Sequence, residues 1–229
     1  LRGGNGYASL GSRMIDEQKF INSRILAFIV LTIFVTPFLV GVPAQADDTA
    51  AGAKSFIEGL ADEAVKSLAA PNIGAAERRE RFRKIMLQNF AFKRIARWAL
   101  GRYWRRATPS ERTEYLKLFE NMLVIVYADR FSSYSGETLN VERSEVRGDN
   151  DILVHSKVVR SGSQKPISIA WRISKDMLNN GAFKIVDVMV EGLSMGVTQQ
   201  KEFSSVIRKS GKGVQGLLEE LKKRIAANS

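Results

Sequence analysis

The dominant pattern of apolar and polar positions lies within residues 92–136, which contain a short apolar segment, a glycine break and a long amphipathic segment. Thr108, Pro109 and Glu111 predict the start of the long helix, because they form a capping box with proline at the first helical position. Its apolar surface is wider than one narrow stripe, and consists of Tyr115, Leu118, Phe119, Met122, Leu123, Ile125, Val126 and Tyr127. A helix of this kind, expected over residues 110–135, is either a central core helix or packs on one partner and a ligand.

Helical spacing of apolar residues predicts four further helices. The first ends before Pro71, the second spans residues 75–89, and two more follow the strands at 198–209 and 214–225. The residues of the second helix that are expected to face inward are Phe82, Ile85, Met86 and Leu87. Its opposite, arginine-rich face is most simply solvated, and docking of an anionic partner is the alternative.

From residue 138 the period of the pattern changes from 3.6 to 2, which indicates β-strands. Four segments have this period and are separated by short turns: residues 138–146, 152–159, 167–173 and 182–190. The last segment is apolar on both faces, so it needs cover on both sides. Four strands joined by short turns predict an antiparallel sheet, and the helices around it make an α+β domain.

The N-terminal region contains an apolar run at residues 25–42, preceded by basic residues and followed by small ones. This order is typical of a secretory signal peptide, and we expect residues 14–46 to be one, cleaved after Ala46. A permanent membrane anchor is the alternative, because the run is close to the roughly 18-residue lower limit for spanning a bilayer. Residues 1–13 are interpreted as upstream sequence, which leaves 47–229 as one domain.

The composition limits the reactions and ligands that this protein can have. The chain has no cysteine and a single histidine, His155, and its formal net charge is +11. Disulfides and thiolate metal sites are excluded, and triad or zinc hydrolase chemistry is disfavoured. A basic protein attracts anions, and with an export signal we expect phospholipid headgroups or acidic protein faces rather than nucleic acid. The arginine and aromatic cluster at residues 97–106 is interpreted as a rim that docks such anions, together with Lys222, Lys223 and Arg224.

Two longer motifs carry a family resemblance: A-L-G-R-Y-W-R-R-A-T-P-S-E-R at residues 99–112 and K-I-V-D-V-M-V-E-G-L-S-M-G-V-T-Q-Q-K-E-F at 184–203. With the export signal, Tyr127 and the segment Y-S-G-E at 134–137, they make the chain resemble the MlaC family of toluene-tolerance, periplasmic phospholipid-binding proteins. The resemblance covers essentially all of residues 47–229.

The resemblance implies a periplasmic carrier, expected to be a monomer, with an NTF2-like fold in which a curved sheet and helices surround an apolar cavity. Its cargo is a diacyl phospholipid, and its partners are an outer-membrane lipoprotein complex and an inner-membrane ABC transporter with a lipid-binding ring. It implies no catalytic residue, no metal and no cofactor beyond the bound lipid. A hopanoid-associated lipid carrier of the same family is an alternative.

The lipid tails are expected between the apolar side of the 110–135 helix and the inner face of the sheet, because this helix has more apolar surface than one packing contact requires. The candidate wall residues are Tyr115, Phe119, Met122, Val126, Trp171, Ile185 and Val188. Two tails bring about 30 methylenes, worth on the order of 24 kcal/mol against water at about 0.8 kcal/mol each. The competing interpretations are an exported NTF2-like enzyme and an anion-binding adaptor without a pocket.

Overall fold

The computed structural model describes residues 44–148, 151–160, 165–176 and 180–228. All of them belong to one unit, Gly41–Ser229. The predicted signal peptide and the residues before it lie outside the described residues, except for residues 44–46, which begin the first helix. Within the described part of the chain, no helix is both long enough and apolar enough to cross a membrane.

The sheet is antiparallel, with its strands in sequence order from one edge to the other. The strands are β1 (Thr138–Arg147), β2 (Asp151–Val159), β3 (Ile167–Asp176), β4 (Ala182–Val190) and β5 (Leu193–Ser194). The predicted four-stranded meander is confirmed, and the two-residue β5 extends it by one strand. Irregular register between Val141 and Arg143 and between Arg172 and Ile173 interrupts the pairing at two places, and such bulges bend strands and increase their twist.

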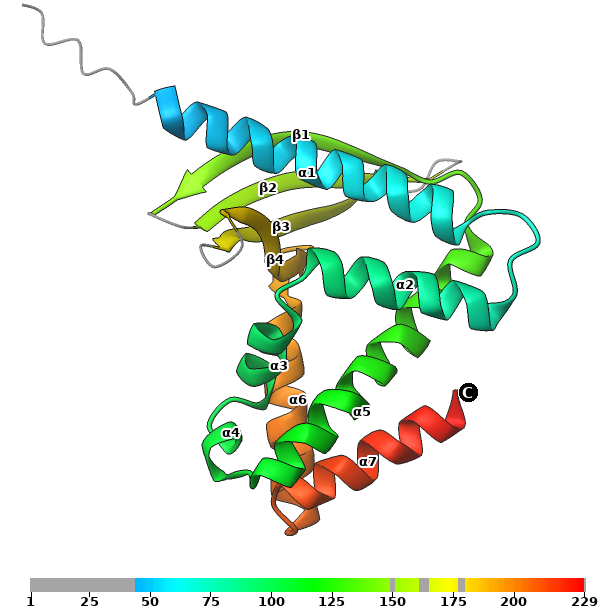
Figure 1. The fold of residues 1–229 in the computed structure, drawn as a ribbon, viewed down its shortest axis with the longest axis vertical. Helices are drawn as coiled ribbons and strands as arrows, with labels where there is room; N and C mark the ends of the chain where they lie inside the picture. The colour runs from blue at the N-terminus through cyan, green and yellow to red at the C-terminus, as the bar shows by residue number, and fades with distance from the viewer. Residues whose placement is uncertain (1–43, 149–150, 161–164, 177–179, 229) are drawn as a thin grey trace, which may run out of the picture. The chain divides into compact units, whose positions relative to one another are not determined.

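Two long helices accompany the sheet (Figure 1). Helix α1 (Ala44–Leu68) packs on β1 and β2, and α2 (Ala75–Asn89) contacts α1, β4 and the helical part of the protein. A hydrophobic cluster, here called the sheet core, joins α1 and α2 to the strands. Its buried members are Ala53, Ile57, Leu60, Leu68, Ile85, Ile152, Val154, Ile173 and Ile185.

The remaining helices form a second cluster, here called the helical core. The helices are α3 (Phe92–Leu100), α4 (Tyr103–Arg106), α5 (Pro109–Ala128), α6 (Met195–Ser210) and α7 (Val214–Ala227). Helix α3 lies beside α6, and α5 lies beside α7 (Figure 1). At the centre, the rings of Tyr115 and Phe119 stack at 5.6 Å, and Phe203 meets both edge-on. The Tyr115 hydroxyl donates to the Ala96 carbonyl at 2.9 Å, and burial raises its pKa well above the usual value.

The two cores are linked at the end of α2. Phe82 and Phe90 pack against both clusters. Phe90 forms an isolated bridge with Ile185 of β4, and the Ala91 amide donates to the Ile185 carbonyl at 2.9 Å. The chain between α2 and α3 is therefore held to the sheet by backbone hydrogen bonding as well as by apolar contact.

The long central helix agrees with its predicted start and differs at its end. The Thr108 side chain accepts from the Glu111 amide, and the Glu111 carboxylate accepts from the Thr108 amide at 2.8 Å, which confirms the capping box. Helix α5 ends at Ala128 instead of near residue 135, because the chain tightens into the 3-10 helix η1 (Asp129–Ser133). On α2, Leu87 is 41% exposed, so the prediction that it faces inward is wrong.

The junction between β4 and α6 is organised by Asp187, which is only 6% exposed. Its carboxylate accepts from the Ser194 hydroxyl at 2.6 Å and from the Gly196 amide at 3.1 Å. Gly196 in turn lies against the Trp98 ring, where a Cβ atom would come within 2.0 Å of a ring carbon. These contacts fix where α6 leaves the sheet and how closely α3 packs on α6.

Candidate functional site

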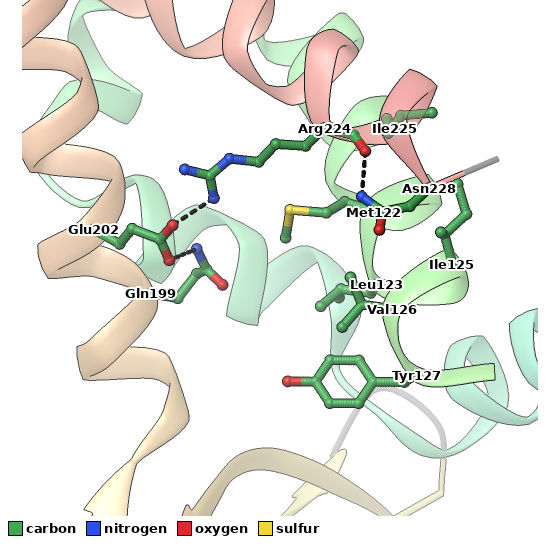
Figure 2. A pocket seen from close by; sticks show the side chains of 10 residues that line it. All are labelled: Met122, Leu123, Ile125, Val126, Tyr127, Gln199, Glu202, Arg224, Ile225 and Asn228. Carbon is green, nitrogen blue, oxygen red and sulfur yellow. Dashed lines mark hydrogen bonds and ion pairs between the residues drawn. The ribbon is translucent and has the colours of Figure 1, made fainter. Parts of the chain in front are cut away.

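A cavity of about 230 Å³ lies between the second half of α5, the middle of α6 and the end of α7 (Figure 2). It is lined by Met122, Leu123, Ile125, Val126, Tyr127, Gln199, Glu202, Arg224, Ile225 and Asn228. Two of the lining side chains are unusually exposed for apolar residues of a central helix, at 39% for Val126 and 37% for Tyr127. The wide apolar surface of α5 is therefore divided between core packing and this cavity.

The position of these residues on α5 follows from helical geometry. Residues three and four apart lie on the same side of a helix, so Tyr115, Phe119 and Met122 form one row that enters the helical core. Val126 continues that row by one turn, beyond the point where the core ends. The side chain of Met122 belongs to both environments, since it is 9% exposed in the helical core and also lines the cavity.

One side of the cavity is polar and internally paired. The Arg224 guanidinium forms an ion pair with Glu202 of α6 and a second with Glu220 at 2.8 Å, and Glu202 is the larger cause of its raised pKa. Gln199 donates to Glu202 at 3.1 Å, and the Asn228 amide group donates to the Arg224 carbonyl at 2.7 Å. This network connects α6 to α7 beside the apolar wall (Figure 2).

The seven predicted wall residues fall into two groups in the structure. Tyr115, Phe119 and Met122 are buried in the helical core, and Val126 lines the cavity next to it. The other three belong to the sheet core, where Ile185 is fully buried and Trp171 and Val188 are half-buried and pack against it. The structure thus brings Met122 and Val126 together at the cavity, and places the sheet residues in a separate cluster.

Trp171 is held within the sheet by a side-chain hydrogen bond. Its indole nitrogen donates to the Ser156 hydroxyl at 2.9 Å, and that hydroxyl donates to the Ile169 carbonyl at 3.2 Å. Both polar groups are therefore satisfied within the sheet, which leaves the ring as an apolar surface in a fixed orientation.

Sequence reasoning did not choose several residues that line the cavity. Leu123, Ile125 and Tyr127 lie on the apolar surface of α5, and Ile225 continues the apolar spacing of α7, so periodicity could have identified them. Gln199 and Glu202 are polar residues on the solvated side of an ordinary amphipathic helix, and no local pattern could have identified them. Among the residues that the structure describes, no group of His, Cys, Asp or Glu side chains has an arrangement suited to a metal ion.

The fold and the cavity together define an α+β protein with a curved antiparallel sheet, a separate helical core and a small cavity, apolar on one side and polar on the other, at the edge of that core. The sequence profile of the family described as MlaC protein matches residues 58–223. The chain belongs to the MlaC family.

Two similar proteins give further context. The intermembrane phospholipid transport system binding protein MlaC of Haemophilus influenzae is 24% identical over 113 residues, which are 49% of this chain and 52% of that relative. The aligned region thus spans about half the length of the relative. A phospholipid-binding protein from Ralstonia solanacearum, solved in complex with a phospholipid, has the same fold with a TM-score of 0.68 and 24% identity. The similarity covers 76% of this chain and 97% of that one.

Proposed function

We propose that this protein is a periplasmic carrier that binds a phospholipid and moves it between an outer-membrane lipoprotein complex and an inner-membrane ABC transporter. Membership of the MlaC family and the phospholipid named with each similar protein support this proposal. The observation that carries it is the cavity beside α5, where Val126 remains exposed although it continues the row of core residues, and where Tyr127 next to it is also exposed.

The size of the cavity indicates how much of a lipid it accommodates. Its volume of about 230 Å³ lies below the roughly 300–1,000 Å³ that small-molecule sites usually provide. A two-tailed lipid therefore requires either a wider space between α5, α6 and α7 or a second contact surface. We propose that Met122 and Val126 form the first wall, and that the half-buried Trp171 and Val188 form the second. Tyr115, Phe119 and Ile185, which are at most 2% exposed, support these walls from behind.

Tail burial provides solubility in this proposal, and it does not provide direction. The transfer of two tails from a bilayer to an apolar cavity is nearly neutral, because both environments exclude water. Net transport from one membrane to the other must then come from differences between the two partner complexes. The export of the chain is part of the same proposal, and N-terminal sequencing of the native protein should find a start at or near Asp47.

The test is lipid extraction and mass spectrometry of the purified protein. A diacyl phospholipid should copurify with the wild type, and Val126→Trp should reduce it several-fold, because the larger ring occupies the cavity. Val146→Trp is the matched control, since Val146 lies on β1 with the same 39% exposure and does not line the cavity. Circular dichroism should show that both variants are folded. A folded Val126→Trp protein with its full lipid content would exclude the cavity as the tail site, and a wild-type protein without any lipid would refute the carrier proposal.

A further inference from the structure

A second concavity, of about 470 Å³, lies at the corner formed by α3 and α4 and shares no lining residue with the cavity beside α5. It is lined by Arg94, Arg97, Trp98, Gly101, Arg102, Trp104 and Arg105, and is here called the arginine–tryptophan surface. Binding at this surface is therefore separable from lipid binding in the cavity beside α5.

The charge of this surface has one sign. Residues 92–110 contain six cationic side chains, Lys93, Arg94, Arg97, Arg102, Arg105 and Arg106, and no aspartate or glutamate. All six are exposed. Within the described residues, the four arginines that line the concavity form no ion pair with any carboxylate. The Arg102 guanidinium donates to the Tyr103 hydroxyl at 3.1 Å, which leaves Arg94, Arg97 and Arg105 as the main groups for a partner. Like charges at this density repel one another and favour an anionic ligand.

The aromatic rings of the surface are held in place from behind. Arg172 of β3 lies over the Trp98 ring at 5.3 Å, Gly196 contacts its edge, and Gln200 donates to the Trp98 carbonyl at 2.7 Å. Arg112 of α5 lies over the Trp104 ring at 5.4 Å and donates to the Trp104 carbonyl at 2.9 Å. The rings therefore need little ordering on binding, which reduces the entropic cost of association.

The lysine and arginine residues at the end of the chain do not contribute in the same way. The predicted docking rim also included Lys222, Lys223 and Arg224. The structure pairs Lys222 with Glu114 at 2.5 Å and Arg224 with Glu202 and Glu220, whereas Lys223 is exposed and lies outside the concavity. The two paired cations connect α7 to α5 and α6 within the protein. The six exposed cations of residues 92–110 are instead grouped at the α3–α4 corner, and four of them line one concavity.

We propose that the arginine–tryptophan surface docks an acidic, carboxylate-bearing segment of a partner protein. A guanidinium group binds a carboxylate through two parallel hydrogen bonds, so several arginines around a depression suit a row of carboxylates. Arginine and tryptophan are also the residues that most often carry binding energy at protein interfaces. The concavity is shallow and open, and its two half-buried tryptophan rings offer apolar contacts to the side chains and backbone of such a segment.

The experiment measures binding of a fluorescein-labelled deca-glutamate peptide to the full chain by fluorescence anisotropy at low ionic strength. Arg97→Glu combined with Arg105→Glu should weaken binding at least about tenfold, a change of about 1.4 kcal/mol. Lys66→Glu combined with Lys223→Glu is the matched control, because it changes the net charge equally at two exposed lysines of α1 and α7. The control should change binding by less than about threefold, since both lysines lie outside the concavity and their attraction to the peptide weakens with distance.

Three results would overturn the proposal. Equal weakening by both double variants would show that only net charge matters, and no binding of the peptide by the wild type would exclude an acidic segment. Binding to phosphatidylglycerol vesicles that is lost in the arginine variant, without peptide binding, would instead assign the surface to a membrane. Lipid content after purification should be unchanged in the arginine variant, so failure of this proposal is distinguishable from failure of the carrier proposal.

Discussion

Two arginine-rich regions lie close together in the sequence and have opposite roles in the structure. On α2, Arg79 pairs with Asp129 of η1 at 2.8 Å, and Arg83 pairs with Glu120 of α5 at 2.9 Å. At the α3–α4 corner, Arg94, Arg97 and Arg105 have no carboxylate partner among the described residues. The first group joins helices to one another, and the second leaves its charges to the solvent or to a partner.

The comparison shows that the number of arginines does not decide whether they stabilise the fold. The α2 arginines also satisfy backbone carbonyls, because Arg78 donates to the Leu68 carbonyl at 3.0 Å and Arg81 to the Ser67 carbonyl at 2.9 Å. These bonds fasten the end of α1 to α2. Partly exposed ion pairs contribute only about 0–1 kcal/mol each, so the α2 network stabilises through several contacts together.

The largest expected effect is at the contact that holds the α3–α4 corner against α6. Gly196→Ala would place a Cβ atom 2.0 Å from a Trp98 ring carbon, and overpacking of this kind costs about 1–3 kcal/mol. Urea denaturation should show this loss, and the tryptophan emission should shift as the ring moves. Gly59→Ala is the control, because no atom apart from the adjacent helix backbone lies within 4 Å of its Cβ position, and this change within α1 should stabilise the protein slightly. Equal stability of the Gly196→Ala variant and the wild type would contradict the close packing of α3 on α6.

A smaller effect is expected from the arginines themselves, and it differs between the two regions. Arg83→Ala should lower the free energy of unfolding by about 1 kcal/mol, because the guanidinium contacts both Glu120 and Asn121 at 2.9 Å. Arg97→Ala should leave stability within about 0.5 kcal/mol of the wild type, as for surface residues without partners. Urea denaturation of the two variants and the wild type would measure both changes in the free energy of unfolding. If the two variants lose the same stability, the distinction between the two regions is wrong.

The smallest effect concerns Glu145 on the sheet, whose pairing with Arg147 and His155 makes its contribution to stability depend on pH. The pKa of the Glu145 carboxyl is lowered from 4.5 to about 2. The larger cause is the hydrogen bond from Arg147 at 2.9 Å, and the next is the hydrogen bond with His155. A depressed pKa contributes stability above about pH 4.5, and that contribution is lost as the pH falls through about 2. Glu145→Gln should therefore be less stable than the wild type near neutral pH, and this difference should vanish toward pH 2. A difference in urea midpoints that does not change with pH would exclude this assignment.

Most of the fold could be predicted from the sequence, because the signals for its elements are local. The capping box at Thr108 sets the start of α5 within one turn, and the alternation in residues 167–173 identifies β3 without knowledge of its neighbours. The end of α5 was predicted too far along the chain, because η1 continues a helical pattern with a tighter hydrogen-bond spacing.

The candidate site could be predicted only in part. Met122 and Val126 were chosen from the apolar surface of α5, and both line the cavity. Tyr115 has the same pattern and is fully buried, with its hydroxyl bonded to Ala96. A residue that fills a core and a residue that lines a cavity are alike in sequence, since both are apolar and recur at the same spacing.

The sequence by itself determined the α+β class, the positions of the strands and most helices, and the concentration of positive charge between residues 92 and 110. Only the tertiary structure decided which apolar residues remain uncovered and which arginines find a carboxylate. Asp129 lies 50 residues after Arg79, and Glu120 lies 37 residues after Arg83. Periodicity and capping act within a few residues of the chain, whereas ion pairing and cavity formation depend on groups that only folding brings together.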